Sequence, residues 1–408
     1  MWHGFGGWRS AICIEELYTS CLVPLRFTAY RLFIAEKTAC LLLQLYDYGD
    51  ETRDRTCALH GRILSLKQDP QNVLYRTTWP SLQTGLARHP VIEADDTKDL
   101  LQHYFSLHLN LADLYEQWSK ADPNFAKKAP EFAGVRILSQ DAWEALVGFI
   151  CSSNNNIARI SQMVHKLCIH YGPLIGYVGD EPIHDFPTPE ALSGSKVESH
   201  LRELGFGYRA KYIAQTARVI AKEKPAGWLE TLRNPESAIK IFDKAAPGDI
   251  PTYRAAHEEL LALTGVGPKV ADCVCLMGLG WGESVPVDTH VWQIAQRDYK
   301  MGRSKTKTLN KAMYDAVGDH FRGIWGSYAG WAHSVLFTAD LKSFADRPLK
   351  RELVLESEIT PENRDSNQSS QKRVKAENAV KVKPEQEVEA AVVDMELPAK
   401  RRRTRRRL

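Results

Sequence analysis

The pattern of apolar and polar positions divides the chain into stretches of different character. Between residues 57 and 79 apolar and polar side chains alternate, and residues 69–72 read Asp-Pro-Gln-Asn, a turn sequence between the two alternating runs. Alternation with a period of two predicts strands, so this stretch predicts an antiparallel hairpin. From Thr97 almost to residue 340 the apolar positions instead recur with the spacing of helices. Residues 1–56 have only weak periodicity and no clear caps.

Local signals mark the ends of several predicted helices. Asp141 is followed three residues later by Glu144, a capping box, and Gly172 closes the apolar run that begins at Ile157. Thr188 followed by Pro189 places a proline at a first helical position. Together these patterns predict an α+β protein, mostly α, with an N-terminal antiparallel β-sheet subdomain followed by helices.

The composition changes near the C-terminus. No aromatic residue follows Phe344 and no glycine follows Gly330, while Glu, Lys, Ser, Gln and Pro dominate to the end. Such a composition is typical of disorder. We therefore expect four parts, which are an atypical segment at 1–56 whose fold the pattern does not define, a sheet-plus-helix subdomain at 57–135, a helical domain at 136–343, and a disordered tail at 344–408.

The charge is distributed unevenly. Seven of the 53 basic residues lie between Lys400 and Leu408, which leaves 46 basic against 50 acidic side chains in the rest of the chain. Nucleic-acid binding by the folded part would therefore depend on a local patch or on backbone and helix-end donors. The cluster from Lys400 to Arg407 predicts recognition by the nuclear import machinery and a nuclear location, with the mitochondrion as the alternative compartment, or else a phosphate-binding arm.

Composition also excludes several classes of protein. Hydrophobic residues make up 44% of the 408 residues and charged residues 25%, as in globular proteins. The longest apolar stretches are far shorter than the roughly 20 residues that span a bilayer, so no membrane association is expected. The eight cysteines form no Cys-x-x-Cys pair and no zinc-module spacing with His. We expect buried thiols, no cofactor, and no metal in the chemistry, although a cation could bind the carbonyls of the hairpin described next.

Residues 253–279 predict a helix, a tight hairpin and a second helix. A helical run ends near Leu263, the sequence Thr-Gly-Val-Gly occupies residues 264–267, and Pro268 opens the next run. Two glycines permit a sharp turn that brings the amides of Gly265, Val266 and Gly267 close to a ligand, and the following helix N-terminus favours a phosphate. The same pattern also occurs in ordinary turns between helices, so the hairpin alone leaves both interpretations open.

Two residues near this hairpin carry candidate chemistry. Lys269 lies in the first turn of the second helix, where the helix dipole and partial burial both disfavour an ammonium and so favour an amine that can attack carbon and form a Schiff base. Asp288 precedes an apolar run as a predicted N-cap, and a carboxylate there can also stabilise an oxocarbenium ion. The alternatives are a solvated lysine and a purely structural cap. His290 could donate to a phosphate or simply pack.

These residues resemble the signature of the helix-hairpin-helix superfamily of DNA glycosylases. Within it, the chain is most similar to the eukaryotic 8-oxoguanine DNA glycosylase/AP lyase family, through the segments at 149–159 (FICSSNNNIAR), 204–210 (LGFGYRA) and 328–332 (YAGWA). The resemblance runs from about residue 57 to residue 342. It implies the helix-hairpin-helix DNA glycosylase fold, in which two helical subdomains form a cleft. No cysteine follows Cys275, so the iron-sulfur loop of the adenine glycosylase and endonuclease III branches is absent.

The resemblance implies roles for residues that contact the reacting sugar and the DNA. Lys269 would displace the damaged base and, as a Schiff base, allow β-elimination, with Asp288 assisting at C1′. Asn154 would fill the gap left by the extruded nucleotide, Tyr208 would wedge the base stack, and two arginines would read the orphan cytosine. The DNA-contacting set is Asn154, Asn155, Arg159, Tyr208, Arg209, Gly265, Val266, Gly267 and His290. Without the resemblance, Asn154–Asn156 is a polar loop that caps a helix.

The resemblance also implies a base-binding pocket. Cys273 lies one helical turn after Lys269 and would pack, with Phe337, on the two faces of the extruded base. At position 333, where that family commonly has a glutamine that reads the base, this chain has His333. A neutral imidazole offers one donor and one acceptor, fewer than an amide, so we expect base reading to differ in detail. For Cys273 and Phe337 the alternative is core packing.

The largest departure from the family is at the start of the chain. The family's Gly-Gln-Ser-Phe-Arg-Trp segment, whose glycine carbonyl recognises the oxidised base, has no counterpart in residues 1–56. The resemblance begins abruptly near Cys57, so we expect an altered or wrongly assembled N-terminus rather than gradual divergence. We expect a sheet that lacks its first strands, and lyase chemistry with weakened base discrimination.

The function predicted from these observations is excision of 8-oxoguanine opposite cytosine from damaged double-stranded DNA, by a monomer, with strand cleavage 3′ to the abasic site. One alternative is the same chemistry on other oxidised or ring-opened purines. A second is a catalytically silent DNA-binding protein. Lys269 together with Asp288 argues against the second, because binding alone requires neither.

Overall fold

The computed structural model describes residues 9–13, 46–47, 55–68, 72–80, 95–237, 251–302 and 309–341. The chain divides into one unit at Met1–Arg347 and another at Pro348–Leu408. The second unit, and with it nearly all of the predicted tail and its basic cluster, lies outside the described residues. The fold below is that of the first unit.

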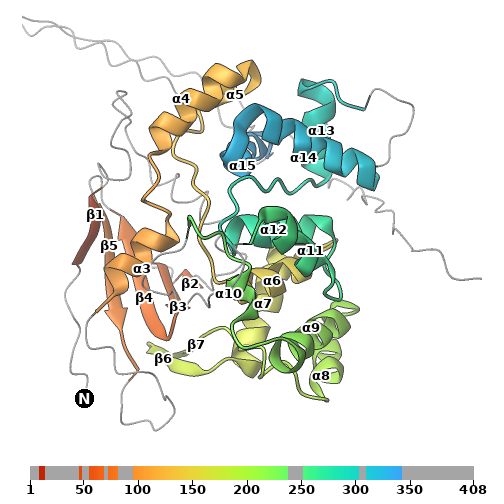
Figure 1. The fold of residues 1–408 in the computed structure, drawn as a ribbon. Coiled ribbons are helices and arrows are strands. Elements are labelled where there is room, and N and C mark those ends of the chain that lie inside the picture. Colours follow the sequence, from red (N-terminus) through yellow and green to blue (C-terminus); the bar gives the residue numbers. More distant parts are fainter. Residues whose placement is uncertain are drawn as a thin grey trace, which may run out of the picture. The chain divides into compact units, whose positions relative to one another are not determined.

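A five-stranded antiparallel sheet forms the N-terminal part (Figure 1). Strand β4 (Arg62–Gln68) pairs with β5 (Asn72–Thr78) from Gln68 opposite Val73 to Ile63 opposite Thr78, which confirms the predicted hairpin. Most of its turn, residues 69–71, lies outside the described residues. A further strand, β3 (Arg55–Leu59), precedes β4 through a turn in which His60 and Gly61 both have positive φ, the geometry that suits a two-residue hairpin.

The expectation that the sheet lacks its first strands is wrong. Strand β1 (Arg9–Cys13) pairs with β5 and β2 (Tyr46–Asp47) pairs with β3, so the strand order is β1-β5-β4-β3-β2. Both edges are therefore formed by the segment 1–56. An edge strand exposes unpaired backbone donors and acceptors, and pairing with them makes little demand on side-chain identity. This is why a segment with weak periodicity can still complete the sheet.

Two elements cover the sheet. Helix α3 (Thr97–Tyr104) contributes Leu100, Leu101 and Tyr104 to a core shared with strands β3–β5. A small hairpin, β6 (Leu174–Val178) and β7 (Glu181–His184), packs Ile175 and Ile183 against Ile63. This hairpin interrupts the predicted run of helices because its apolar side chains cover the sheet. The predicted helix start at Thr188 is also wrong, since residues 189–192 form only a turn.

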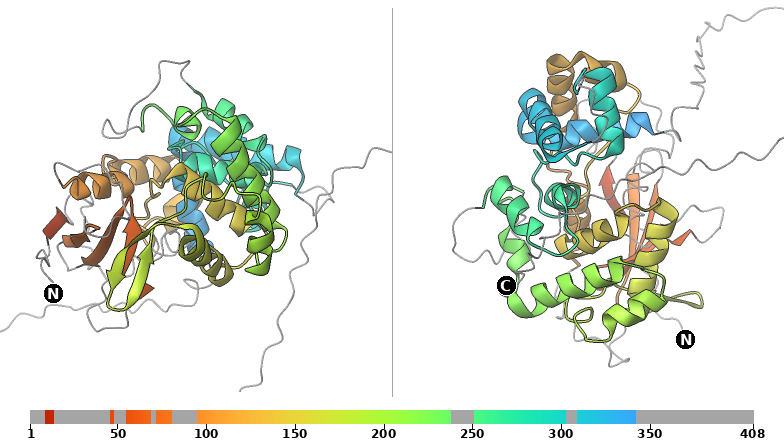
Figure 2. Two further views of the ribbon diagram at one scale, coloured as in Figure 1. Left: turned by 90° about the horizontal axis from the view of Figure 1, so that it is seen from below. Right: turned by 90° about the vertical axis from the view of Figure 1, so that its right-hand side faces the viewer.

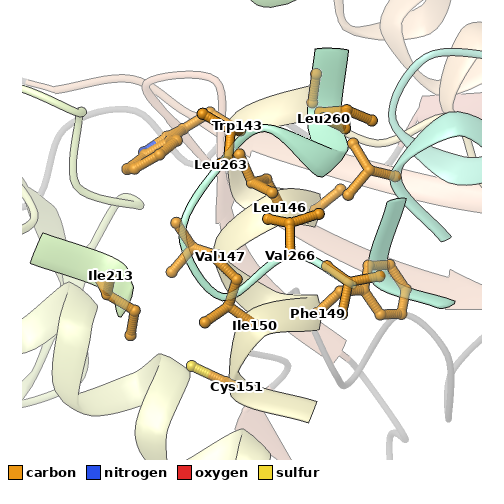
Figure 3. Packing of buried hydrophobic residues seen from close by; sticks show 14 of the residues in the cluster. Trp143, Leu146, Val147, Phe149, Ile150, Cys151, Ile213, Leu260, Leu263 and Val266 are labelled. Atoms are coloured by element: carbon orange, nitrogen blue, oxygen red, sulfur yellow. The ribbon is translucent and has the colours of Figure 1, made fainter. Parts of the chain in front are cut away.

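Helix α6 (Ala142–Ser152) is the centre of the first helical core and is buried along most of its length. Figure 3 shows its side chains facing residues of the predicted hairpin, with Val266 among them. The predicted caps at Asp141, whose Oδ1 accepts from Glu144 N at 2.8 Å, and at Gly172 are confirmed. The other elements of this part are α7 (Ile157–Tyr171), α8 (Val197–Glu203), α9 (Arg209–Arg218), the π-helix η2 (Val219–Glu223), α10 (Trp228–Thr231), α11 (Tyr253–Leu261) and α12 (Pro268–Met277).

A second helical core contains the C-terminal helices. Phe321 stacks on Trp325, and Phe125 packs edge-on against Trp325 from a segment far earlier in the chain. Figure 2 shows α4 and α5 beside these C-terminal helices, so part of the segment that the sequence groups with the sheet packs elsewhere. The elements are α4 (Leu111–Ala121), α5 (Pro123–Lys128), α13 (Thr289–Asp298), α14 (Lys311–Trp325), the 3₁₀ turn η3 (Gly326–Tyr328) and α15 (Ala329–Asp340). None of the described helices combines the length and the apolar character needed to cross a bilayer.

Candidate active site

The predicted helix-hairpin-helix is present as α11, residues 262–267 and α12. Gly265 has φ +83°, and a Cβ there would overlap the ring of Tyr212 on α9, so the position requires glycine. Pro268 occupies the first turn of α12, directly after Gly267 as N-cap. Val266 is buried in the first core, and its N–H donates to Leu263 O at 3.3 Å. The Val266 amide is therefore used within the hairpin, which leaves Gly265 and Gly267 as the candidate phosphate donors of the predicted trio.

Lys269 lies half-buried in the first turn of α12. Its Nζ is 5.0 Å from the ring centroid of Phe149 on α6, a cation-π arrangement, and its charge acts on the thiol of Cys273 on the same helix. Burial raises the pKa of Cys273 to about 11; the charge of Lys269 acts in the opposite direction, while Asp272 and Asp288 add to the rise. Cys273 is therefore a protonated, apolar wall of the site, and the amine of Lys269 is the candidate nucleophile.

Asp288 is the N-cap of α13, as predicted. Its Oδ1 accepts from Val291 N at 2.9 Å, and the side chain is half-buried. Its charge acts on Cys273 of α12 and on His333 of α15. The carboxylate therefore lies close enough to act on side chains of both α12 and α15, although α12 and α13 belong to different helical cores.

His333 is buried on α15, and neither ring nitrogen makes a hydrogen bond of standard geometry within the described part of the chain. Burial lowers the pKa of His333 to about 4, against the opposing effects of Asp288 and the Gly330 backbone. The ring is therefore neutral at pH 7. Phe337, one turn later and half-buried, has its ring centroid 6.3 Å from that of His333 and 6.0 Å from that of the exposed His290.

The predicted asparagine loop joins α6 to α7. Asn155 Nδ2 donates to Cys151 O at 3.0 Å, and Asn156 caps α7 by accepting from Arg159 N at 2.9 Å. These two residues thus perform the structural roles expected of a polar loop. Asn154 differs, since it is exposed and has φ +47°. Of the three, Asn154 has the geometry of a side chain presented to a ligand.

Two arginines and a tyrosine surround this loop. Arg159 is exposed and donates to Gly205 O at 3.3 Å, while Tyr208 is 46% exposed and donates to Ser153 O at 3.2 Å. Arg209 is buried, donates through Nη2 to the carbonyls of Ser153 and Asn154, and lies 4.5 Å from the Tyr208 ring centroid. Arg159 and Tyr208 are thus presented at the surface, whereas Arg209 holds the loop that carries Asn154.

Sequence reasoning overlooked three supporting residues. Phe149 faces the Lys269 amine, Tyr212 packs against Gly265, and Asp272 lies buried on α12 between Lys269 and Cys273. Only Asp272 left a local signal, as a lone carboxylate in an apolar helical run. The contacts of Phe149 and Tyr212 arise from packing between helices far apart in the sequence.

The groups that act on one another here are a lysine amine, a capping carboxylate, a protonated thiol and a neutral imidazole, with a phenylalanine ring beside the imidazole. An amine can form a covalent bond to an electrophilic carbon, and a nearby carboxylate can stabilise the positive charge that develops there.

Comparison with protein families divides the chain into two matched parts. The model of the 8-oxoguanine DNA glycosylase N-terminal domain matches residues 39–146, and that of the HhH-GPD superfamily base excision DNA repair protein matches residues 147–316. The first match starts at residue 39, so the expectation that the resemblance begins near Cys57 is corrected. Strand β2 lies inside the matched region.

Individual proteins agree with these matches. An N-glycosylase/DNA lyase of Saccharomyces cerevisiae is 42% identical over 263 residues, which is 60% of this chain and 67% of the relative. The N-glycosylase/DNA lyase OGG1 of Arabidopsis thaliana is 39% identical over 247 residues, which is 59% of this chain and 61% of the relative. The chain thus spans about two thirds of the length of the relatives it matches.

Solved structures share the fold. The structure of MBOgg1 with a low affinity DNA ligand has a TM-score of 0.57 and 26% identity, and covers 75% of this chain and 89% of that one. The Clostridium acetobutylicum 8-oxoguanine glycosylase/lyase, in complex with DNA containing cytosine opposite 8-oxoguanine, has a TM-score of 0.57 and 24% identity, and covers 77% and 91%. With both halves matched by the family models and the yeast relative 42% identical, the chain belongs to the 8-oxoguanine DNA glycosylase family of the helix-hairpin-helix base-excision repair superfamily.

Proposed function

We propose that the protein is a bifunctional DNA glycosylase that excises 8-oxoguanine opposite cytosine and then cleaves the strand 3′ to the abasic site. The observation that carries this proposal is that Lys269, at the start of α12, and the Asp288 carboxylate both act electrostatically on the buried thiol of Cys273. The family models match residues 39–146 and 147–316, and relatives named as N-glycosylase/DNA lyases are 42% and 39% identical, which supports the same assignment.

The chemistry follows from these groups. The Lys269 amine attacks C1′ of the extruded nucleotide, the glycosidic bond breaks, and the base leaves with its bonding electrons and accepts a proton. Asp288 stabilises the positive charge at C1′ while that bond breaks. Loss of the amine proton and opening of the sugar ring give a Schiff base between Nζ and C1′. Removal of a C2′ proton then expels the 3′ phosphate by β-elimination.

The base would lie between Cys273 and Phe337, with His333 at its edge. The neutral His333 ring has one donor and one acceptor with which to bind a base. This observation also favours a second candidate function, in which the same chemistry acts on other oxidised or ring-opened purines. Competition between duplexes that carry 8-oxoguanine and a ring-opened purine, each opposite cytosine, separates the two candidates by their single-turnover rates.

DNA would be bound around the asparagine loop and the hairpin. The exposed side chains of Asn154, Tyr208 and Arg159 would fill the gap, wedge the stack and read the orphan cytosine. The Gly265 and Gly267 amides would bind a phosphate. We assign to Arg209 a contact with the same cytosine, in addition to its hydrogen bonds to the Ser153 and Asn154 carbonyls of the loop. These surfaces belong to a single chain, so we propose a monomeric enzyme.

The cellular location is a separate part of the proposal. The basic cluster from Lys400 to Arg407 has the composition of a nuclear import signal, which supports a nuclear location. Fusion of residues 344–408 to a fluorescent reporter should direct it to the nucleus, and replacement of the arginines by glutamine should abolish this. A mitochondrial signal from the full-length fusion would contradict the assignment.

The central test is covalent trapping. The protein is incubated with a duplex that contains 8-oxoguanine opposite cytosine, borohydride is added, and the adduct is resolved by denaturing electrophoresis. Wild type should be trapped and Lys269→Gln should not. Lys196→Gln is the matched control, because Lys196 is an exposed lysine at the start of another helix, α8. Trapping on an abasic duplex alone would show that base recognition is missing, and no adduct on either duplex would support the binding-only alternative.

A further inference from the structure

Asp272 is a buried carboxylate on the helix that carries the nucleophile. Its side chain is 2% exposed, and its neighbours on α12 from Val270 to Leu276 are all apolar. A carboxylate removed from water destabilises a protein unless hydrogen bonds replace its hydration. The partners that Asp272 acquires therefore indicate why a charge is placed here.

Three hydroxyl groups donate to this carboxylate. Tyr253 Oη on α11 is 2.5 Å from Oδ1, Ser284 Oγ is 2.8 Å from the same oxygen, and Tyr314 Oη on α14 donates to Oδ2. Burial and the adjacent Asp272 charge raise the pKa values of Tyr253 and Tyr314. Both phenols therefore remain protonated donors. The guanidinium of Arg322 donates to Tyr253 Oη at 3.4 Å and places a positive charge behind it.

Two of these donors connect α12 to the segment that ends at Asp288. Ser284 Oγ also contacts the backbone oxygen of Asp272, at 2.9 Å, which fastens the chain four residues before Asp288. Tyr314 Oη accepts from Val287 N at 3.3 Å, and Val287 immediately precedes Asp288. One carboxylate thus joins the helix of Lys269 and Cys273 to the backbone that presents Asp288.

The same segment also anchors the helix of the base pocket. Gly330 N donates to Gly282 O at 2.9 Å, and a Cβ at Gly330 would overlap Ser284 O. Helix α15, which carries His333 and Phe337, therefore begins in close contact with the segment that Asp272 fastens. The hydrogen bonds of Asp272 sit at the junction of all three parts of the site.

We propose that Asp272 is a positioning residue for base excision. Through Ser284 and Tyr314 it holds the Lys269 amine and the Asp288 carboxylate in the spacing at which both address one C1′. This inference rests on the proposed glycosylase function. Asp272 touches no substrate, because its oxygens are enclosed by protein hydroxyls. Displacement of reacting groups by about 1 Å can lower a rate on the order of 100-fold, so small losses in this network should be measurable.

The test uses Tyr314→Phe and Ser284→Ala, which each remove one donor, together with Asp272→Asn. The control is Asp122→Asn. Asp122 is 4% exposed and, like Asp272, accepts from a tyrosine hydroxyl, that of Tyr299 at the C-terminal end of α13. It caps α5 in the second core, and within the described residues it has no hydrogen bond to α12 or to residues 282–288. For each protein we would measure the single-turnover excision rate on the 8-oxoguanine duplex, the Kd for that duplex, and the Tm.

We expect Tyr314→Phe to lower the single-turnover rate constant by on the order of 10-fold, with the Kd within about twofold of wild type. The Asp272→Asn and Tyr314→Phe effects should be less than additive when combined, because both act through one network. Asp122→Asn should lower the Tm and leave the rate constant unchanged. A lower rate constant with an unchanged Kd in Tyr314→Phe, and an unchanged rate constant with a lower Tm in the control, are not produced by loss of stability alone.

Two results would overturn the inference. One is a wild-type rate constant in both Tyr314→Phe and Ser284→Ala, with a fall in Tm like that of the control. The other is a loss that resides entirely in the Kd. If Asp272→Asn fails to fold, Tyr314→Phe and Ser284→Ala still test whether the network positions the reacting groups. Inactive wild type would instead refute the proposed function, so the two failures are distinguishable.

Discussion

Asp288 combines a structural and a chemical role, and two substitutions separate them. In Asp288→Asn an amide oxygen replaces the carboxylate oxygen that accepts from Val291 N at 2.9 Å, so the cap of α13 is retained while the charge is lost. Asn and Asp are equally good N-caps. In Asp288→Ala both the cap and the charge are lost. The difference between the two variants therefore isolates the cap, and the difference between Asp288→Asn and wild type isolates the charge.

The magnitudes differ between the two roles. Loss of an N-cap costs about 1 kcal/mol, which for a folded unit of this size corresponds to a fall in Tm of about 2 °C. Loss of one preorganised charge at a reacting centre lowers a rate constant by about 100- to 1,000-fold. His333 does not confuse the comparison, because Asp288 raises the pKa of His333 and its removal leaves that buried ring still neutral at pH 7.

The assay measures single-turnover excision with enzyme in excess over the 8-oxoguanine duplex, alongside Tm from the far-UV circular dichroism. Asp288→Asn should have the wild-type Tm and a single-turnover rate constant far below that of wild type. Asp288→Ala should lose the same rate and about 2 °C besides. The reasoning is refuted if Asp288→Asn excises within about threefold of wild type, since the charge would then have no part in the reaction.

Three further predictions concern the hairpin, the pocket and the loop. Gly265→Ala should destabilise by about 1–3 kcal/mol, because φ is +83° and a Cβ meets Tyr212, whereas Gly267→Ala, with nothing near its Cβ, should change the Tm much less. His333 has a folded pKa lowered to about 4 from 6.5, so the unfolded chain binds more protons between these values and stability falls as the pH falls through that window, by up to about 3 kcal/mol; urea titrations at pH 7 and pH 4 should show a smaller loss in His333→Gln. Arg209→Met leaves the Ser153 and Asn154 carbonyls without their donor, so the midpoint of urea unfolding should fall by the equivalent of about 1–3 kcal/mol, and a wild-type midpoint would contradict the role of Arg209 in the loop.

Residues whose roles depend on near neighbours in the chain were predictable. Asp288 is a cap, Pro268 opens a helix, and Gly265 turns a hairpin, because each role is decided within four residues of backbone. The resemblance to a glycosylase family depended on the same local motifs. The β4–β5 hairpin was recognised for the same reason, since its alternation and turn lie within a single stretch of chain.

Long-range pairing escaped prediction. Strands β1 and β2 join the sheet through backbone hydrogen bonds, which depend little on the pattern of side chains. The β6–β7 hairpin buries Ile63 of the sheet, a contact between segments far apart in the sequence. The hydrogen bonds from Arg209 to the Ser153 and Asn154 carbonyls were also not predicted, since they arise only when the folded loop brings these acceptors to the guanidinium. Each of these contacts depends on which backbone groups lack a hydrogen-bond partner, or which apolar side chains remain exposed, after the other elements have packed.

The sequence by itself determined the chemistry of the site, because a lysine in a first helical turn and a capping carboxylate are local features with local physical reasons. Only the tertiary structure decided how those groups meet. Asp272 draws its donors from residues 253, 284 and 314, which adjoin only after two helical cores have packed. A buried charge is stable only where hydrogen-bond partners surround it, and the positions of those partners depend on the whole folded unit.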